Sequence, residues 1–395
     1  MASGVTLLIM ASGPTVGTAE AERWLTTARL ALALDLAERA AEIPAIERII
    51  LIAPAEALTE LDPGIPKLAL EPPAEEFHFG EALRGLIARW EIETLLYFSG
   101  GSGALLTAEE LERLAMRLAR TARRGERLAM VNNFYSTDFL ALTPARALFE
   151  LPSPGRDNEL GWLLADHGFT PLELERNAAT QFDVDTPTDL GILKLYAAYT
   201  PDLPGRRARA LLEGLPLDTC LLEAALDRFT DREAVILVAG RVGAHVWRFL
   251  ERETACQVRV FAEERGMEAL GRAERGEVRS LLGFLLEEVG PRRFFVRLVE
   301  LAELAIIDTR VIFAHLGLRP TAADRFHSDL MQPAPIQDSV LKEFTAAAAA
   351  APLPVVLGGH SLVSGGLYAL VELAWAHYED EGELPRRKVP LSEPS

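Results

Sequence analysis

The sequence predicts an α/β protein of two domains, each built on a mainly parallel sheet with helices on both faces. Its 395 residues exceed a single ordinary domain, which has roughly 100–200 residues. Short apolar runs alternate with longer segments of helical periodicity, which is the pattern of repeated strand–helix units. A breaker-rich segment, Tyr199–Gly205, separates these units into two groups.

The predicted strands are short runs rich in Val, Ile and Leu. In chain order they are Val5–Met10, Ile49–Ala53, Thr94–Phe98, Leu128–Asn132, Val235–Ala239, Val258–Phe261, Ala305–Ile307 and Val355–Leu357. Between them, Ala19–Ala41 and Ala108–Arg124 have helical periodicity, and the second places Leu111, Leu114, Ala115 and Leu118 on one face. Ala346–Ala351 continues a helix from Ser339, because alanine has the highest helix propensity.

These elements predict a first domain over residues 1–200 and a second over 233–380, with a charged tail over 381–395. Residues 201–232 are expected to form a linker, because breakers are followed by a helical pattern, Arg206–Phe229, and then by a new strand. No internal repeat is apparent.

Composition excludes several classes of protein. A net charge of −18 opposes general nucleic-acid binding. No apolar run reaches the ~18 residues of a membrane span, and the N-terminus lacks the basic start of a signal peptide. Cys220 and Cys256 are the only cysteines, so neither a disulfide framework nor a cysteine metal site is expected. We expect a cytoplasmic protein whose partner is a small metabolite or a nucleotide. A homo-oligomer is left open.

Three segments of the first half carry candidate chemistry. The loop after the first strand offers small residues that let backbone N–H groups approach phosphate, namely Ala11, Ser12, Gly13 and Gly17. After the strand at residues 94–98, a second such turn contains Gly100, Gly101, Ser102 and Gly103, and Thr107 with Glu110 fits a capping box. A tight turn without a ligand is the alternative interpretation of this second segment.

The third segment is Phe182–Leu190. Alternation places Asp183 and Asp185 on one face of an extended chain, and Pro187 suits the first position of a helix. The two aspartates are candidate metal ligands, and a helix-capping pair is the alternative.

In this order, the three segments resemble the MobA-like nucleotidyltransferases, which have a GT-A fold related to the Rossmann type. The resemblance covers about half of the chain, and residues 183–190 are its most specific part. It implies an NTP in the two glycine loops, Mg²⁺ at Asp183 or Asp185, and an acceptor side lined by residues 131–134 and 137–140. Asn132 is a further candidate nucleotide contact.

The chain departs from that family in two ways. The first loop of the family carries an Arg and a Lys, whereas residues 11–28 here contain one basic residue, Arg23. The metal-binding Asp of the family falls near Gly101 or Ser102, which have no carboxylate. Lysine occurs only four times in the whole chain.

The second half resembles no family that we recognise, and its candidates follow predicted strands. Residues 240–243 could hold an anion at a helix N-terminus. The loop at residues 358–366 has four glycines and offers Gly358, Gly359 and Ser361 as ligand contacts, although helix packing could also explain it. The candidate catalytic residues are Asp308, Arg310, His315 and His360, with a mutual Asp308–Arg310 salt bridge as the alternative.

The leading hypothesis is therefore a divergent nucleotidyltransferase-like protein. It would bind a nucleotide or nucleotide sugar and, if active, transfer a nucleotidyl or glycosyl group to a small metabolite with Mg²⁺. One rival is an inactive scaffold or sensor with a metabolite-binding second domain. The other places catalysis in the second domain.

Overall fold

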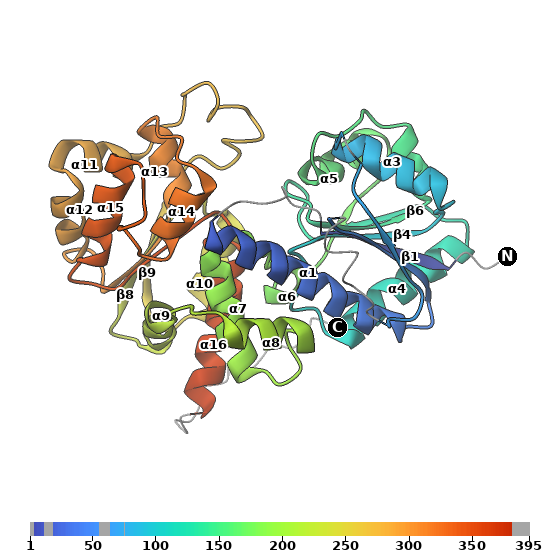
Figure 1. Cartoon of the computed structure of the whole chain (residues 1–395), viewed down its shortest axis with the longest axis horizontal. Coiled ribbons are helices and arrows are strands. Elements are labelled where there is room, and N and C mark those ends of the chain that lie inside the picture. The colour runs from blue at the N-terminus through green and yellow to red at the C-terminus, as the bar shows by residue number, and fades with distance from the viewer. Residues whose placement is uncertain (1–3, 12–18, 55–63, 75, 381–395) are drawn as a thin grey trace, which may run out of the picture.

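The computed structural model describes residues 4–11, 19–54, 64–74 and 76–380 and confirms the predicted fold class. Two sheets with helices on both faces form two lobes that lie side by side (Figure 1). Ser12, Gly13, Gly17 and the tail from residue 381 lie outside the described residues. None of the described helices is long and apolar enough to cross a membrane.

The first lobe contains a seven-stranded sheet with the order β3-β2-β1-β4-β6-β5-β7. Every pair of neighbours is parallel except those of β6, which runs antiparallel to β4 and to β5. The strands are β1 (Val5–Met10), β2 (Ile46–Ile52), β3 (Leu68–Glu71), β4 (Leu95–Ser99), β5 (Leu128–Val131), β6 (Phe139–Thr143) and β7 (Leu172–Glu173).

Side chains alternate across this sheet, so each face has its own core. Leu7 and Ile9 face one hydrophobic cluster with α1 (Glu20–Ala41) and α4 (Ala108–Arg123). Leu8 and Met10 face the other cluster, with α3 (Phe79–Arg89) and α5 (Leu160–Asp166). This arrangement leaves the carboxyl ends of β1 and β4 free for a site.

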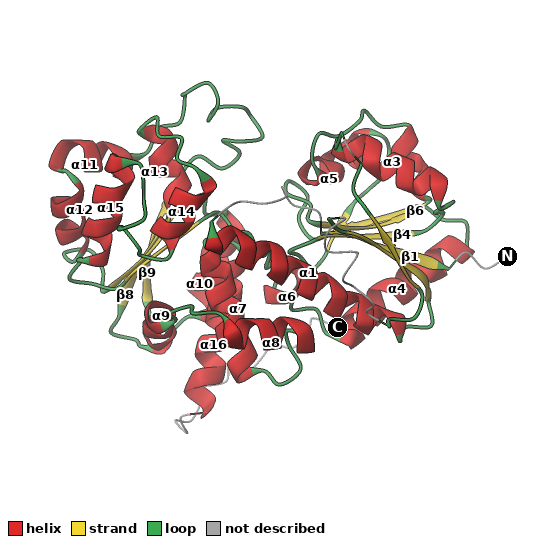
Figure 2. Ribbon diagram, viewed as in Figure 1, coloured by secondary structure: helices red, strands yellow, loops and turns green. Residues whose placement is uncertain are grey.

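The second lobe has a four-stranded parallel sheet with the order β11-β10-β8-β9. Its strands are β8 (Val235–Gly240), β9 (Gln257–Ala262), β10 (Leu304–Asp308) and β11 (Val355–Gly358). Helices cover both faces (Figure 2). One face packs against α7 (Pro187–Tyr199), α9 (Cys220–Thr230), α10 (Ala244–Glu253) and α16 (Gly365–Asp380). The other packs against α11 (Leu281–Val289), α12 (Pro291–Leu298), α13 (Thr309–His315) and α15 (Ser339–Ala349).

The lobes are joined by direct packing between α16 and the helices that follow the first sheet. At Gly365, an added Cβ would lie 1.9 Å from the carbonyl oxygen of Gln181, the last residue of α6 (Ala178–Gln181), so only glycine fits there. Glu372 accepts hydrogen bonds of 3.0 Å from the Ala178 N–H and from the Tyr196 hydroxyl. α1 also reaches α8 (Arg206–Gly214) and α14 (Ala322–Asp329). The predicted domain boundaries stay a prediction.

All eight predicted strands are present, but three strands and one helix break were not expected. β3, β6 and β7 were not predicted, because they are short or lack a turn signal. The helical segment predicted over 206–229 is divided into α8 and α9 by residues 215–219. The physical reason is Pro216, which disfavours helical conformation at Leu215 and cannot donate a backbone hydrogen bond.

Candidate functional site

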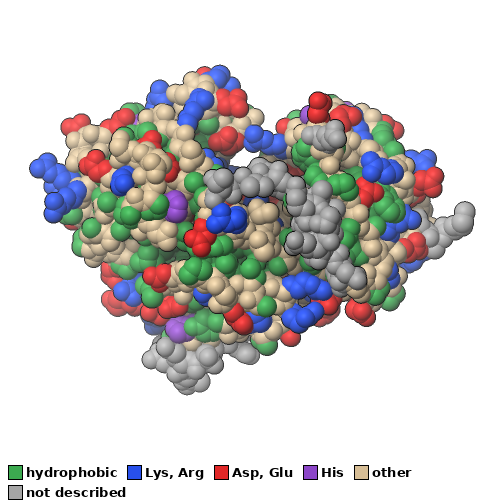
Figure 3. Space-filling model, in the orientation of Figure 1, with side chains coloured by type: hydrophobic (Ala, Val, Ile, Leu, Met, Phe, Trp, Pro, Cys, Tyr) green, Lys and Arg blue, Asp and Glu red, His purple; other side chains and the backbone are tan. Residues whose placement is uncertain are grey.

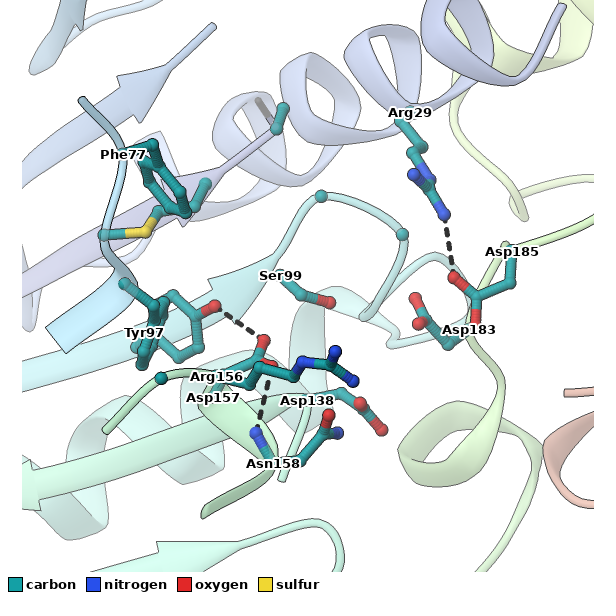
Figure 4. Close-up of a pocket in the computed structure, with 16 residues that line it drawn as sticks. Arg29, Phe77, Tyr97, Ser99, Asp138, Arg156, Asp157, Asn158, Asp183 and Asp185 are labelled. Carbon is teal, nitrogen blue, oxygen red and sulfur yellow. Dashed lines mark hydrogen bonds and ion pairs between the residues drawn. The ribbon is translucent and has the colours of Figure 1, made fainter. Parts of the chain in front are cut away.

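A pocket with a volume of about 330 Å³ lies at the carboxyl ends of β1 and β4. Its walls come from several segments of the first lobe that are far apart in the sequence (Figure 4). The lining residues include Met10, Ala11, Arg29, Phe77, Tyr97, Gly100, Gly101, Asp138, Arg156, Asp157, Asp183 and Asp185. Three of the described residues predicted to contact nucleotide, Ala11, Gly100 and Gly101, are in this lining. The loop and motif candidates of the first half therefore meet at one place.

The two lining glycines are required by close approach. At Gly100, an added Cβ would lie 2.6 Å from the Ala11 Cα, which belongs to the chain leaving β1. At Gly101, it would lie 2.3 Å from Asp183 Oδ1 and 2.9 Å from the Val184 carbonyl oxygen. The turn after β4 thus packs directly against the third motif, and position 101 has no room for the aspartate of the family.

Ser102, Gly103 and Asn132 lie behind the pocket and support its walls rather than lining it. The Ser102 hydroxyl donates hydrogen bonds of 3.1 Å to the Ser99 and Asp138 carbonyl oxygens. Gly103 has a φ of 74°, which favours glycine. Direct nucleotide contacts by these three residues stay a prediction that this arrangement does not favour.

Asp183 and Asp185 both line the pocket, as their predicted common face requires. Arg29 of α1 donates from Nη2 to Asp185 Oδ1 at 2.7 Å and from Nε to the Val184 carbonyl oxygen at 2.8 Å. Asp183 Oδ1 is buried and has no hydrogen-bond partner among the described residues. Arg29 was not predicted as part of the site, because the basic residues of the family were expected within residues 11–28.

Asp138 supplies a further carboxylate that was named only as part of the acceptor side. It immediately precedes β6, and the antiparallel direction of β6 brings its amino end to the carboxyl end of β4. Asn132 fixes it: Asn132 Nδ2 donates to Asp138 Oδ2 at 3.0 Å, and Asn132 Oδ1 accepts from the Asp138 N–H at 2.9 Å. The apolar run Phe139–Thr143 is the signal that could have revealed this strand and its leading aspartate.

Asp157 completes the acidic lining from the loop that precedes α5. Its Oδ2 accepts a hydrogen bond of 2.9 Å from the Tyr97 hydroxyl of β4. The neighbouring Arg156 is exposed and also lines the pocket. The pocket therefore combines four carboxylates with the guanidinium groups of Arg29 and Arg156.

Asp138, Asp157 and Asp183 resist ionisation, mainly because they are buried and also because they lie close to other carboxylates. Burial, followed by the charge of Asp157, raises the pKa of Asp138 to about 8. Burial, followed by the charges of Asp185 and Asp138, raises the pKa of Asp183 well above its ordinary value. Burial also raises the pKa of Asp157. Such mutual repulsion is typical of carboxylates that function with a cation or a proton.

The structure corrects the capping interpretation of the third motif. The carboxylate that caps α7 is Asp189, whose Oδ2 accepts from the Thr186 N–H at 2.7 Å and from the Thr186 hydroxyl at 2.9 Å. Asp183 and Asp185 are thus not a capping pair. Pro187 starts α7 as predicted, and the predicted box at Thr107 and Glu110 is also present.

In the second lobe, the alternative interpretation of Asp308 and Arg310 as a mutual salt bridge is wrong. Asp308 accepts from Arg241 Nε at 2.6 Å and from Arg241 Nη2 at 3.1 Å. Arg310 instead donates to both carboxylate oxygens of Asp329, at 2.8 and 2.6 Å. Each buried charge has found a partner on another element, which the spacing of residues 308 and 310 could not indicate.

His315 does not join the other candidate catalytic residues. It ends α13, about 9 Å along the helix from Thr309. Its Nδ1 accepts from the Ser280 N–H at 3.1 Å, and its ring contacts Phe284 of α11. His360 follows β11 and lies near Asp308, whose charge acts on its pKa. Asp308, Arg310 and His360 thus lie at the strand ends, whereas His315 lies at the opposite end of α13.

The loop after β11 makes contacts between the lobes. The Ser361 hydroxyl donates to Asp189 Oδ2 at 2.6 Å, and an added Cβ at Gly359 would lie 3.1 Å from Thr186 Cγ2. At Gly358, it would lie 2.8 Å from the Leu362 side chain. A ligand-binding role of Gly358, Gly359 and Ser361 stays a prediction.

Comparison with known proteins gives structural neighbours that are aligned over about half of the chain. No family model matches the chain, and no curated protein matches it. A cytidylyltransferase from Leptospira borgpetersenii is 12% identical, has a TM-score of 0.39, and is aligned over 54% of this chain and 93% of its own. A CMP:2-keto-3-deoxy-manno-octonic acid synthetase complexed with CTP is 12% identical, with a TM-score of 0.35, over 50% and 99%.

A Mycobacterium tuberculosis protein in complex with manganese is 16% identical, with a TM-score of 0.32, over 48% of this chain and 96% of its own. Each of these structures is similar to about half of this chain and is covered over nearly its whole length.

Proposed function

We propose that the first lobe binds the phosphates of a nucleotide or nucleotide sugar with Mg²⁺ in the acidic pocket, and transfers a nucleotidyl group to a small metabolite. One observation carries this proposal: Asp138, Asp157, Asp183 and Asp185 line a single pocket at the carboxyl ends of β1 and β4. Ligands of open α/β sheets bind at such strand ends.

The donor set of the pocket fits Mg²⁺. Among the described residues, no group of three or more His, Cys, Asp or Glu is placed to hold a metal ion. Mg²⁺ needs fewer protein ligands, because it keeps water molecules and is commonly bound by one or two carboxylates together with substrate phosphates. Asp183, whose buried Oδ1 lacks a described partner, and Asp138 would hold it. There, Mg²⁺ would neutralise phosphate charge.

The other residues of the pocket have separable roles. Arg156 is exposed at the pocket and can pair with phosphate oxygens. Arg29 holds Asp185 and the Val184 carbonyl, and so orients the segment that carries Asp183. Phe77 is 51% exposed while lining the pocket, so its ring offers an apolar wall to a base or sugar.

A second candidate function is nucleotide binding without turnover. The observation in its favour is Gly101, where a side chain would clash with Asp183 and its neighbours. If the family's carboxylate cannot be accommodated there, the ligand can be held without being activated. A turnover assay that follows pyrophosphate release separates the two functions.

Thermal unfolding of the full chain with NTPs and sugar nucleotides, each with and without Mg²⁺, tests the proposal. A ligand at ~100 times its Kd stabilises the folded state by about 2.7 kcal/mol. We expect a Mg²⁺-dependent shift that Asp183→Asn and Asp138→Asn abolish. Asp166→Asn, an exposed residue at the end of α5, is the matched control and should keep the shift. A shift that survives in Asp183→Asn, or no shift with any nucleotide, would overturn the proposal.

A further inference from the structure

The carboxyl ends of β8, β10 and β11 form a second polar edge. Pairing of Ile307 with Ala239 and of Asp308 with Gly358 brings the three strands to an end at the same level. In the order β11-β10-β8-β9, β9 lies on one side of β8 and β10 lies on the other side. The chain therefore changes direction across the sheet at β8. Such a reversal creates a crevice at the carboxyl ends, where open α/β sheets bind ligands.

This second edge lies against the segment that carries Asp183. Gly359 approaches Thr186, and Ser361 bonds to Asp189, so His360 sits between two contacts with residues 186–189. On the face shown in Figure 3, a hollow separates the tops of the two lobes. A molecule bound at the second edge would therefore lie next to the acidic pocket.

Cationic side chains from both lobes gather around this edge. Burial, followed by the charges of Arg176 and Arg265, lowers the pKa of His245 to about 4. Burial, followed by the charge of Arg241, lowers the pKa of His360 to about 4, and Arg265 contributes again. The two imidazoles are therefore neutral at physiological pH and each offers one N–H donor, while Arg176 and Arg265 carry the positive charge that would attract an anion.

Two of these arginines keep donors for a ligand after their protein contacts are made. Arg176 pairs through Nη2 with Glu173 at 2.9 Å, while its Nη1 is buried with no hydrogen-bond partner among the described residues. A buried donor without an acceptor is costly, so a bound anion would relieve it. Arg265 is exposed in the loop that follows β9.

His245 lies in the first turn of α10, and its ring lies beside the N-cap residue, Gly243. An added Cβ at Gly243 would lie 2.5 Å from His245 Cε1 and 2.7 Å from His245 Nδ1. Gly243 is the N-cap of this ten-residue helix and makes no side-chain capping bond. The partial positive charge of a helix N-terminus is thus added to the cluster of basic side chains.

We propose that this crevice, surrounded by Arg176, Arg265, His245 and His360, binds the phosphate or carboxylate group of a small molecule that is the second substrate. Its assignment as the second substrate rests on the proposed nucleotide function, whereas anion binding itself does not. The lobes then hold the two substrates side by side, one at each set of strand ends.

Calorimetric titration of the full chain with inorganic phosphate, without Mg²⁺, tests anion binding. We expect Arg265→Gln to lower the phosphate affinity about tenfold or more, because a charge-assisted contact is removed. Arg176→Gln should act in the same direction. Arg252→Gln, at the far end of α10 and exposed, removes the same charge and should bind phosphate like the unmodified chain. Equal affinity in Arg265→Gln and the unmodified chain, or no phosphate binding at 10 mM, on the order of cellular phosphate, would overturn the inference.

Two further arms separate this site from the nucleotide pocket. Asp183→Asn should keep phosphate binding while losing the Mg²⁺-dependent nucleotide shift, so the two proposals can fail independently. Titration of phosphate into the chain saturated with nucleotide and Mg²⁺ identifies the source of the anion. Simultaneous binding supports a second substrate. Displacement of phosphate by the nucleotide would assign the anion to the nucleotide's own phosphates and overturn the second-substrate assignment.

Discussion

The Ser361 hydroxyl donates a 2.6 Å hydrogen bond to Asp189 Oδ2 across 172 residues of sequence. The same oxygen accepts from the backbone N–H groups of Asp185 and Thr186, at 3.0 and 2.7 Å. A single buried carboxylate therefore fixes the end of the acidic motif and ties it to the loop after β11. The position of the pocket depends on the second lobe through this contact.

Replacing Ser361 with alanine should destabilise the protein by about 1–3 kcal/mol, because a buried carboxylate loses a donor. The measurement is urea unfolding, compared with Ser364→Ala. Ser364 lies in the same loop but donates only to the backbone carbonyls of His360 and Ser361. If both variants lose the same free energy of unfolding, the hydrogen bond to Asp189 contributes no more to stability than the backbone bonds of Ser364.

The stability of the ligand-free protein should fall as the pH rises from about 6.5 to 8. Below about 6.5, the lowered pKa values of His245 and His360 act in the opposite direction. Burial raises the pKa of Asp189 to about 7, above the ordinary value of 3.8, so the folded state binds this proton more tightly than the unfolded state. The stabilisation is complete below pH 3.8 and is lost as the pH rises through about 7. Asp138, with a pKa of about 8, extends the loss to higher pH.

Unfolding free energies measured by urea at pH 5, 6, 7 and 8, that is, at roughly unit intervals across both pKa values, check this expectation. Asp189→Asn should flatten the profile between pH 5 and 7, and Asp138→Asn should flatten it up to pH 8. Asp166→Asn, which is exposed, should leave the slope unchanged. A profile that rises between pH 7 and 8, or one that neither variant alters, would contradict the assignment of the raised pKa values.

Arg241→Leu should cost about 3–5 kcal/mol, because it leaves Asp308 buried and unpaired. The Asp308 side chain is fully buried and that of Arg241 is 14% exposed. Adding Asp308→Asn to this variant should restore part of the stability, since the charge is removed while an acceptor for the Arg310 N–H remains. If the double variant is as unstable as the sum of the single ones, the pair is not coupled.

The first lobe was largely predictable because its motifs are local. An apolar run predicts β1 and β4, and a capping residue predicts the start of α7. The pocket forms where β1 and β4 end and α7 begins. Asp138 was expected on the acceptor side and not beside Asp183. Its position depends on β6, an antiparallel strand that lies between β4 and β5. Nothing local to residues 137–140 shows which strand will be their neighbour.

In the second lobe, the strands were predictable from the sequence but the contacts of the charged side chains were not. Asp308 pairs with Arg241, 67 residues away, and Arg310 pairs with Asp329, 19 residues away. Such pairs are set by which strand ends meet in the sheet, so they require the strand order β11-β10-β8 and cannot be read from adjacent positions.

Gly101→Ala should remove Mg²⁺-dependent nucleotide binding while the chain still folds. The added Cβ would lie 2.3 Å from Asp183 Oδ1, 2.9 Å from the Val184 carbonyl oxygen and 3.0 Å from the Val184 nitrogen. Because two of these atoms are backbone, Asp183 and Val184 must shift together, which moves the proposed ligand away from the pocket. Overpacking of this kind costs about 1–3 kcal/mol.

Gly85→Ala is the matched control, since an added Cβ there has nothing within 4 Å. Gly85 lies inside α3, where alanine should raise stability by about 0.5–1 kcal/mol and leave the nucleotide shift intact. Both variants are compared by thermal unfolding with and without nucleotide and Mg²⁺. A full Mg²⁺-dependent shift in Gly101→Ala would mean that the present position of Asp183 is not needed, and the metal would then have to be held by Asp138 and Asp157.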